Sequence, residues 1–314
     1  NKEVSSVIYT LTTNPAIDMN IITDGIRSKY VNRTSTTVYT PNGKGLNVSF
    51  VLQHFNVPST VLGFFGGFSG EYIVKEIEKR GFKSHPVWVE DLTRINVFLN
   101  DGEQEYKFVN GGSFVSRDKQ DEMLDIIKSR KDMDYLSISG SLPPGISPEY
   151  YEEILSICND KSVKVILDVS SPKLKELLRF RPYLIKPNDE EIAEIFGIVM
   201  KSEPDIVDAL GYLHEKGAQN ILLTLGEKGA YFSKGKDIYY VEAYPVKLLS
   251  SACAGDSSLA AFLSIWLENT KSIETALKRC AAGGANVAES NGIGDLAQVD
   301  NYMGKINVRR VNDK

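Results

Sequence analysis

Short apolar runs recur along this chain of 314 residues and alternate with longer amphipathic stretches. The runs are rich in Val, Ile and Leu, as buried strands are, and the stretches between them have the spacing of helices. Strands that alternate with helices predict βαβ units in a three-layer α/β/α fold, in which a mostly parallel sheet has helices on both faces. The expected strands lie near residues 7–11, 59–63, 135–138, 163–167, 183–185 and 220–224, and the expected helices include 71–80, 148–158 and 204–216.

Two regions interrupt the alternation and predict a second, smaller sheet. Residues 19–40 are polar and β-prone, and residues 86–110 have the pattern strand, strand, turn, strand, with Asn100-Asp101-Gly102 at the turn. We interpret both regions as parts of an accessory sheet, or lid, attached to a single domain that spans residues 1–314. A surface hairpin without such a role is the alternative.

The composition argues against several classes of protein. The net charge is −5 and no run of Lys and Arg stands out, so a nucleic-acid surface or an anionic-membrane surface is not indicated. The three cysteines form no CxxC pair and the three histidines lie far apart, which argues against a disulfide framework and a zinc site. No apolar stretch approaches the ~18 residues of a membrane span. The sequence as given starts without an apolar leader, and we expect a cytoplasmic protein that acts on small molecules.

The strongest functional pattern is a run of small residues, 250–258, that leads into a helical stretch with Asp256 in its first turn. Backbone N–H groups converge in such a run and the helix N-terminus adds partial positive charge, so the segment can bind an anion. An Asp beside that anion can take a proton from an attacking hydroxyl while the N–H groups stabilise a transferring phosphate. The alternative is that Asp256 only caps its helix.

A second pattern, Asn-Gly-Lys-Gly-Leu-Asn at residues 42–47, lies directly before a helical stretch. Its glycines allow a ligand to approach the backbone closely, with Lys44 and Asn47 nearby as a cation and an amide. The GxxxxGK[ST] spacing of a Walker A loop is absent. A loop with a solvated lysine is the alternative.

A third pattern, Lys-Pro-Asn-Asp-Glu-Glu at residues 186–191, follows an expected strand. Asn188 and Glu191 would share one face of the next helix, where an amide and a carboxylate can hold Mg²⁺ through water beside phosphates. The alternative is that the two residues cap the helix.

Two glycine-bearing segments, 224–230 and 139–145, also follow expected strands. The first could receive nucleotide phosphates or form a plain β-turn, and the second combines small hydroxyl residues with a rigid turn. Open α/β sheets bind their ligands at the carboxyl ends of the strands, so these patterns together indicate one site.

Taken in order, these patterns resemble the ribokinase-like (PfkB) sugar kinases. The resemblance covers nearly the whole chain, and the first three segments are most similar to the branch with 1-phosphofructokinase and tagatose-6-phosphate kinase. The segments that carry it are 12–18, 42–47, 63–70, 139–145, 186–188, 224–230 and 254–256.

The resemblance implies a role for each matching residue. The catalytic base would be Asp256, and the anion hole would be the backbone of Cys253, Ala254, Gly255 and Asp256. The sugar phosphate would be bound by Asp18, Gly43, Lys44, Asn47, Arg94 and Ser141, with Lys44 and Arg94 on its phosphate. The ATP and its Mg²⁺ would be bound by Lys186, Asn188, Glu191, Thr224, Gly226, Gly229 and Asn286, with Glu191 near the metal through water.

Two positions depart from the family pattern. Cys253 and Asn42 each stand where the family usually has glycine. We expect Asn42 to be tolerated because Asn adopts left-handed backbone almost as glycine does. Cys253 puts a side chain into the expected anion hole, where the helix N-terminus should lower the pKa of its thiol.

By resemblance, the reaction is transfer of the ATP γ-phosphoryl group to a primary hydroxyl of a ketohexose phosphate. Fructose 1-phosphate is the first expected substrate and tagatose 6-phosphate the second. A sugar-phosphate-binding or nucleotide-binding protein without activity is the alternative of another class, which Cys253 keeps open. The family's accessory sheet implies a lid and, in addition, a homodimer contact.

Overall fold

The computed structural model describes residues 6–311. Their main sheet has ten strands in the order β14-β13-β12-β11-β10-β9-β8-β1-β4-β5. The strands from β5 to β11 in this order are parallel, and β12, β13 and β14 are added antiparallel. Their bounds are β1 Ile8–Thr12, β4 Ser59–Gly66, β5 Lys83–Val89, β8 Tyr135–Ser139, β9 Lys164–Asp168, β10 Leu184–Ile185, β11 Ile221–Thr224, β12 Ala230–Ser233, β13 Ile238–Val241 and β14 Val308–Arg310.

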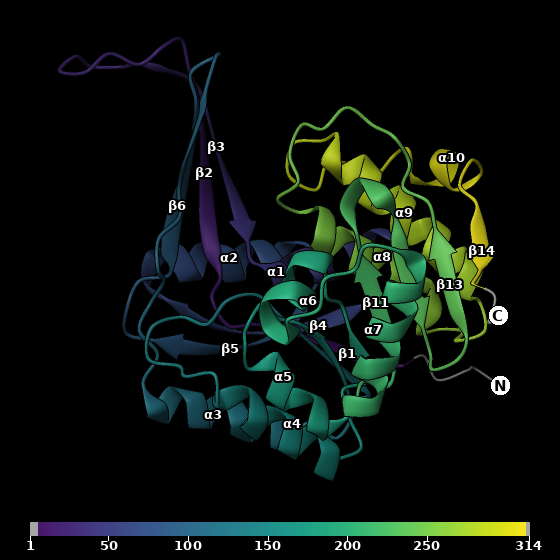
Figure 1. The fold of residues 1–314 in the computed structure, drawn as a ribbon. Coiled ribbons are helices and arrows are strands. Elements are labelled where there is room, and N and C mark those ends of the chain that lie inside the picture. Colours follow the sequence, from purple (N-terminus) through teal and green to yellow (C-terminus); the bar gives the residue numbers. More distant parts are fainter. Residues whose placement is uncertain (1–5, 312–314) are drawn as a thin grey trace.

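Helices cover both faces of the main sheet, as the alternation predicts (Figure 1). On one face, apolar side chains of α3 Arg117–Ser129, α4 Tyr150–Asp160, α5 Leu174–Leu177, α6 Asp189–Phe196 and α7 Glu203–Lys216 form one core with the sheet. On the other face lie α1 Lys44–His54, α2 Gly67–Lys79, α8 Ala254–Trp266, α9 Ile273–Ala288 and α10 Val299–Met303. Two 3₁₀ turns, Leu178–Phe180 and Gly226–Lys228, complete the helical elements. The three-layer α/β/α expectation is confirmed.

Strand β1 illustrates why the central strands read as continuous apolar runs. All five of its residues are buried. Ile8 belongs to the core on the α8 side, whereas Tyr9 and Leu11 belong to the core on the α3 side. Because both faces of a parallel sheet are covered, apolar residues dominate both, and the buried Thr10 is accommodated by a hydrogen bond with Ser49 Oγ at 2.7 Å.

The second sheet has four strands in the order β3-β2-β6-β7, and we call it the small sheet. Strands β2 and β6 are parallel, and the other pairs are antiparallel. The small sheet projects from one end of the main sheet (Figure 1). Its bounds are β2 Ala16–Thr23, β3 Thr34–Asn42, β6 Arg94–Asn100 and β7 Glu105–Phe108.

One boundary of the expected accessory sheet is corrected by the structure. Residues from 86 onward were assigned to it, but β5, Lys83–Val89, pairs in parallel with β4 at the edge of the main sheet. Its alternating burial has the pattern of an edge strand, and such a pattern does not distinguish the two sheets. Within the second of the two predicted regions, the small sheet therefore begins only at Arg94. The expected turn at residues 100–102 is confirmed between β6 and β7, with Gly102 at a φ of 93°.

Between residues 6 and 311, no helix has both the length and the apolarity needed to cross a membrane.

Candidate active site

Three polar side chains lie next to one another at the carboxyl ends of β1, β8 and β9. Thr12 pairs with Ser139, and Ser139 pairs with Asp168. Among residues 6–311, Thr12 Oγ1, Ser139 Oγ and Asp168 Oδ2 are buried without a hydrogen-bond partner. Buried polar atoms usually have partners, so a row of unpaired ones at the edge where α/β sheets bind ligands marks a binding site.

Asp256 lies in the first turn of α8, beside this row, and its exposed fraction is 3%. Asn47 of α1 donates a hydrogen bond from Nδ2 to Asp256 Oδ2 at 3.2 Å. Burial, and then the nearby Asp168, raise the pKa of Asp256 to about 7, against the opposing influence of Lys44, Asn47 and Lys186. A carboxylate with a pKa near neutral is suited to accept a proton from a hydroxyl.

Lys186 supplies a buried positive charge next to Asp256. Its Nζ lies 3.4 Å from Asp168 Oδ1, and both side chains are buried. Burial alone would lower the pKa of Lys186, but Asp168, Asp256 and Glu191 raise it above the ordinary value. A Cβ added to Gly255 would lie 3.5 Å from Lys186 Nζ, so the ammonium group faces the N-terminus of α8. Ammonium and helix terminus together favour an anion there.

The backbone from Cys253 to Asp256 was predicted as the anion hole. Ala254 N–H already donates to Ser251 O at 3.2 Å. Gly255 and Asp256 lie in the first turn of α8, where amides have no partner within the helix. No described residue accepts from the N–H of Cys253, Gly255 or Asp256, so these three amides are the donors that remain for a bound anion.

Asn188 and Glu191 do cap α6, which was the alternative interpretation. Asn188 Oδ1 accepts from Glu191 N at 2.8 Å, and Asn188 Nδ2 donates to Glu191 Oε1 at 2.9 Å. Glu191 is also part of the charged cluster, because burial and Asp168 raise its pKa, while Lys186, Ser170 and Lys44 act in the opposite direction. Capping and a place beside the charged cluster are therefore compatible.

Asp18, on β2 of the small sheet, is a buried carboxylate. Its carboxylate accepts from Asn42 Nδ2 and from Asn96 Nδ2, the latter at 3.2 Å. Burial raises the pKa of Asp18, and the two amides and Arg94 oppose this shift. Each carboxylate oxygen thus accepts one amide hydrogen bond and retains a further lone pair.

Asn42 joins the small sheet to α1. We expected Asn42 to be tolerated in place of glycine because Asn can adopt left-handed backbone, and this reason is wrong. Its φ is not positive, so left-handed backbone is not what this position requires. Instead its Oδ1 accepts from Gly43 N at 2.7 Å and from Asn47 Nδ2 at 3.0 Å. A glycine could make none of these contacts.

Arg94 and Ser141 lie where the small sheet meets the end of β1. Arg94 donates from Nη1 to Asn110 O at 2.8 Å and from Nη2 to Asn14 O at 2.9 Å. Asn14 Nδ2 in turn donates to Ser141 Oγ at 3.2 Å. Each terminal nitrogen of Arg94 carries a second hydrogen that these contacts do not use.

Lys44 is exposed in the first turn of α1, after Gly43. A Cβ on Gly45 would lie 2.3 Å from Thr12 Oγ1 and 2.8 Å from Leu11 O, so glycine lets α1 pack directly on β1. The positive charge of Lys44 lowers the pKa of Asp256 and of Glu191. The glycine pattern therefore brings a cation to the charged cluster.

The segment after β11 lies beside Asn188, which forms an isolated parallel bridge with Thr224. Gly226 has a φ of 59° and Gly229 a φ of 92°, values that favour glycine. The amide of Asn286, like that of Asn188, is engaged within the fold. Its Nδ2 donates to Glu289 Oε1 at 3.0 Å and its Oδ1 accepts from Gln298 N at 3.1 Å.

Cys253, the other departure from the family pattern, does not behave as expected. Its φ of −107° and ψ of 1° are open to residues other than glycine, so its side chain causes no backbone strain. The Sγ atom lies 3.7 Å from Asn47 Nδ2. Burial, Asp256 and Asp18 raise the pKa of the thiol to about 12, so the expected lowering by the helix terminus is wrong.

Three residues of this site were missed in the sequence. Asp168 could have been found as a carboxylate that ends an apolar run, as the other strand-end residues do. Asn96, in a β-prone stretch, and Asn14, after β1, carry no such signal. Their roles come from contacts with Asp18, Arg94 and Ser141 that only the fold creates.

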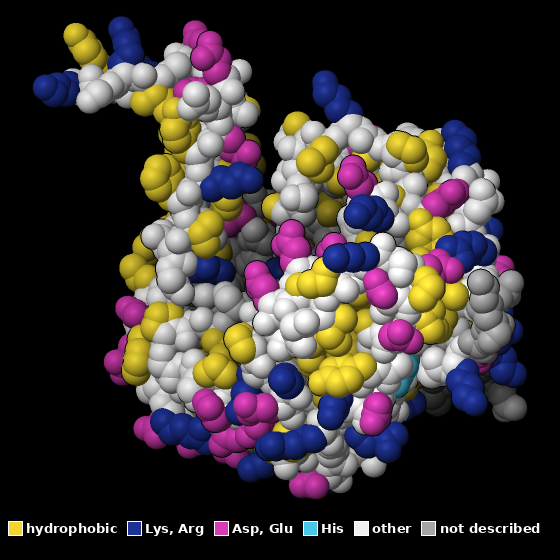
Figure 2. Space-filling model, in the orientation of Figure 1, with side chains coloured by type: hydrophobic (Ala, Val, Ile, Leu, Met, Phe, Trp, Pro, Cys, Tyr) yellow, Lys and Arg dark blue, Asp and Glu magenta, His cyan; other side chains and the backbone are white. Residues whose placement is uncertain are grey.

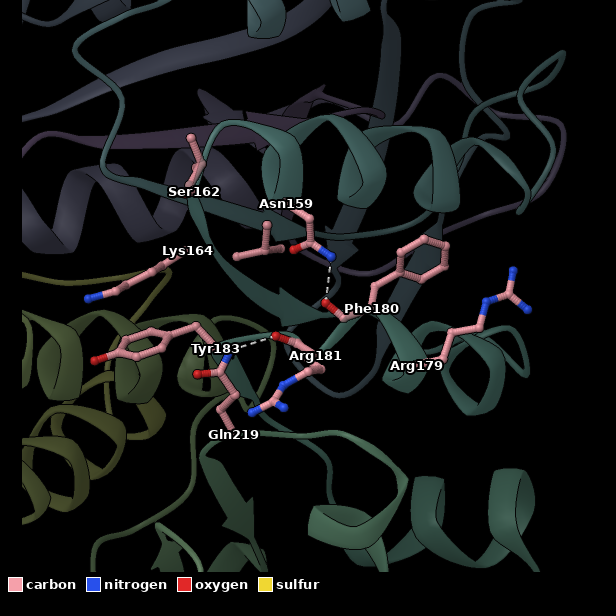
Figure 3. A pocket seen from close by; sticks show the side chains of 10 residues that line it. Asn159, Ser162, Lys164, Arg179, Phe180, Arg181, Tyr183 and Gln219 are labelled. Atoms are coloured by element: carbon pink, nitrogen blue, oxygen red, sulfur yellow. Dashed lines mark hydrogen bonds between the residues drawn. The ribbon is translucent and has the colours of Figure 1, made fainter.

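Two open hollows lie at the other end of the main sheet. The one in Figure 3, of about 320 Å³, is lined by Lys164 and Tyr183, which lie at the amino ends of β9 and β10. The other, of about 690 Å³, is lined by Ile8, Tyr9 and Ser59 at the amino ends of β1 and β4. Neither is lined by the residues described above, and Figure 2 shows a separate hollow between the small sheet and the rest of the molecule.

Comparison with known proteins identifies the family. The model of the pfkB family carbohydrate kinases matches residues 6–298. The chain is 45% identical to a D-tagatose-1-phosphate kinase of Klebsiella oxytoca, over 96% of this chain and 99% of the relative. It is 32% identical to a 1-phosphofructokinase of Borreliella burgdorferi, over 97% and 99% of the two chains. It is 29% identical to a tagatose-6-phosphate kinase of Staphylococcus epidermidis, over 90% and 93%.

Solved structures agree with this relationship. A phosphofructokinase-like protein from Staphylococcus aureus superposes with a TM-score of 0.89 at 28% identity, covering 98% of this chain and all of that one. The tetrameric inhibited form of phosphofructokinase-2 from Escherichia coli superposes with a TM-score of 0.84 at 26% identity, covering 95% and 99%.

Proposed function

The chain belongs to the pfkB family of carbohydrate kinases, and on that premise we propose that it transfers the γ-phosphoryl group of ATP to the C6 hydroxyl of a ketohexose 1-phosphate. Its relatives act, by name, on ketohexose phosphates, so the protein is an ATP-dependent kinase of that class. The alternative of a binding protein without activity loses its support, since Cys253 does not strain the backbone of the first turn of α8.

D-tagatose 1-phosphate is the preferred substrate in this proposal. Identity is 45% to the relative named for that sugar, 32% to the one named for fructose 1-phosphate and 29% to the one named for tagatose 6-phosphate. This order replaces fructose 1-phosphate, the first expectation from sequence, and places it second. Tagatose 6-phosphate, the other expectation, becomes third.

The buried Asp256, with its pKa near 7, is the observation that carries the proposed reaction. Asp256 accepts the proton of the C6 hydroxyl, whose oxygen forms a bond to the γ-phosphorus. The bond from that phosphorus to the β,γ-bridging oxygen breaks, and ADP leaves with the electron pair. Lys186 and the amides of Gly255 and Asp256 stabilise the charge on the transferring group.

The residues present fit Mg²⁺ as the family's usual metal. Asp168 Oδ2 is a buried carboxylate oxygen without a partner among the described residues, and Glu191 belongs to the same charged cluster. No group of three or more His, Cys, Asp or Glu side chains that could hold a metal occurs between residues 6 and 311. Mg²⁺ needs only one or two carboxylates when phosphates and water complete its shell. Bound there, the ion would neutralise phosphate charge, with Glu191 acting through water.

The remaining residues divide between the two substrates in this proposal. Asp18, Asn47 and the backbone at Gly43 bind sugar hydroxyls. Around the sugar's own phosphate lie two cations and a hydroxyl, which belong to Lys44, Arg94 and Ser141. The ATP phosphates and the adenine are bound by Asn188, Thr224, Gly226, Gly229 and Asn286, although the amide of Asn286 also bonds Glu289 and Gln298.

The small sheet is proposed to act as a lid and as a contact in a homodimer. It leaves large apolar side chains exposed, among them Tyr39 at 53% and Phe108 at 58%, which lie in the same cross-strand row and so on the same face. Exposed apolar patches of this kind mark interaction sites, and one structural relative was solved as a tetramer. Light scattering on the wild type and on the Tyr39→Ser, Phe108→Ser double variant tests this proposal. A monomeric wild type would contradict it.

A coupled ADP-release assay with a panel of sugar phosphates tests the proposed reaction. We expect kcat/KM to be highest for D-tagatose 1-phosphate, then D-fructose 1-phosphate, with both 6-phosphates lower by about 100-fold. A 6-phosphate as the best substrate would show that the phosphate end is assigned wrongly. No ADP release with any ketohexose phosphate would contradict the proposed function itself.

A further inference from the structure

Asn42 lies at the junction of the small sheet and the main sheet. It is the last residue of β3, it pairs with Ala16 on β2, and it precedes Gly43, which caps α1. The backbone at this position has no positive φ. The position therefore does not need the glycine that the family pattern has there, and the side chain is free to have a role of its own.

The chemistry of its neighbours sets the direction of every hydrogen bond that Asn42 makes. Gly43 N–H can only donate, so Asn42 Oδ1 is the atom that faces it, at 2.7 Å. The Nδ2 of Asn42 then points to Asp18, whose carboxylate accepts. The same Oδ1 also accepts from Asn47 Nδ2 at 3.0 Å.

This direction continues through Asn47 to Asp256. The amide nitrogen of Asn47 carries two hydrogens. One is given to Asn42 Oδ1, and the other points to Asp256 Oδ2 at 3.2 Å. If the amide turned over, two oxygens would face each other at Asn42 and the Asn47 oxygen would face a carboxylate. Asn42 thus holds the Asn47 amide in the one orientation that donates to Asp256.

We propose that Asn42 is a positioning residue, which aligns Asn47 on Asp256 and Asp18 on the sugar at the same time. This inference rests on the proposed function, because it takes Asp256 as the base and Asp18 as a sugar ligand. It adds that the two groups are oriented by one side chain, so that the proton acceptor and the sugar-binding carboxylate keep a constant relative geometry.

The other polar groups around the two carboxylates do not provide this link. Asp256 is faced by Asp168, Lys186 and Lys44 from the main sheet and α1. Asp18 is faced by Arg94 and Asn96 from the small sheet. Cys253 influences neither orientation strongly, because its Sγ is a weak acceptor 3.7 Å from Asn47 Nδ2.

Asn42→Gly and Asn42→Asp together test the inference. Asn42→Gly removes all three contacts, and we expect kcat/KM for D-tagatose 1-phosphate and D-fructose 1-phosphate to fall about 10- to 100-fold, as for a displaced catalytic group. The KM for ATP should change less than about twofold, since no ATP ligand is displaced. Asn42→Asp has nearly the same shape and keeps both acceptor contacts, but it sets a second carboxylate against Asp18 and should lose more activity than Asn42→Gly.

The order of the two variants separates positioning from simple filling of space. If Asn42 only fills space, the isosteric Asn42→Asp stays near wild type and Asn42→Gly is the worse variant, which would overturn the inference. Asn100→Asp is the matched control, because Asn100 also ends a strand of the small sheet and its Oδ1 accepts from a backbone amide, Gly102 N, at 2.8 Å. This control should leave activity unchanged.

A crystal structure of Asn42→Gly gives a result that does not depend on the substrate. We expect the Asn47 amide to leave Asp256 or to occupy more than one orientation. An Asn47 amide that still donates to Asp256 as in the wild type would overturn the inference, whatever sugar the enzyme uses. Absence of turnover by the wild-type protein would instead contradict the proposed function and leave this structural result to decide on Asn42.

Discussion

The two sides of the site are held in different ways. Asp256, Lys186 and Asp168 come from elements of the main sheet that are packed on both faces, and all three side chains are buried. Asp18, Asn96 and Arg94 come from the small sheet, which leaves apolar side chains exposed and joins the rest at its base (Figure 1). The side proposed for phosphoryl transfer is thus enclosed by the core of the main sheet, whereas the side proposed for the sugar lies at the base of a sheet whose outer part is exposed, although Asp18 and Asn96 are themselves buried.

Because of this difference, we expect substitutions on the two sides of the site to affect different steps. Dense packing keeps charges out of water, and in that environment neighbouring carboxylates and cations shift each other's pKa strongly. Beyond its base, where Ile17 belongs to an apolar core, the small sheet is largely exposed, so the polar contacts of Asp18, Asn96 and Arg94 contribute to its position. Substitutions in the main sheet should therefore change the chemistry, and substitutions at the base of the small sheet should change sugar binding.

The largest expected effect tests the main-sheet side. Asp256→Asn should lower kcat by about two to four decades, since the base is lost while the shape is kept. The KM values for sugar phosphate and ATP should change little. Steady-state kinetics with both substrates varied measure this, and Asp160→Asn, an exposed carboxylate at the end of α4, is the control. A variant that keeps kcat within threefold of wild type would remove Asp256 from its role.

Arg94 tests the small-sheet side with the next largest effect. Arg94→Ala should raise KM for the sugar phosphate about 10- to 100-fold and KM for ATP by less than threefold, because a charged contact to phosphate and the link from Asn14 O to Asn110 O are both lost. Arg94→Lys keeps the charge but cannot bridge both carbonyls.

The pair of Arg94 variants distinguishes two causes. Recovery by Arg94→Lys would mean that charge near the sugar phosphate decides binding. No recovery would mean that the link at the base of the small sheet decides it. Equal changes of both KM values in Arg94→Ala would count against a sugar-side role altogether.

Much of the main sheet, and the edge at which the site lies, could be predicted from the sequence. Apolar runs predicted the central strands, and small or polar residues after them predicted where Asp256, Asn188 and Thr224 would converge, since parallel strands end at one edge. Asp168 was missed because a single carboxylate after a strand is common in any sequence. The role of Asn42 was missed because a motif describes backbone tolerance, whereas its contacts with Asp18 and Asn47 depend on how two sheets meet.

The pH dependence gives a smaller effect with a definite sign. Asp256 must be ionised to accept a proton, so kcat/KM should fall about tenfold per unit as the pH drops below about 7. Its pKa is raised in the folded state, so between pH 4 and 7 the folded state binds more protons than the unfolded state. The stability contributed by this group is therefore present at low pH and is lost as the pH rises through 7.

Thermal unfolding of Asp256→Asn checks that sign. The variant lacks the buried charge, so it should melt at a higher temperature than the wild type at pH 8 and at nearly the same temperature at pH 5. An unchanged difference between the two pH values would show that Asp256 is ionised throughout this range.

Cys253 is expected to have the smallest effect on turnover, although it lies between the two sides. Its backbone conformation needs no glycine, so Cys253→Ala and Cys253→Gly should keep kcat within about threefold of wild type.

The thiol of Cys253 is only half-buried, whereas Cys158 and Cys280 are buried, so alkylation under native conditions reports on Cys253. Burial, Asp256 and Asp18 raise the pKa of this thiol to about 12, which makes alkylation at pH 8 much slower than for an ordinary thiol. Because Asp256 contributes more than Asp18, Asp256→Asn should accelerate alkylation more than Asp18→Asn does. The reverse order would place Cys253 on the small-sheet side of the site, and rapid alkylation of the wild type would show that the thiol ionises despite both carboxylates.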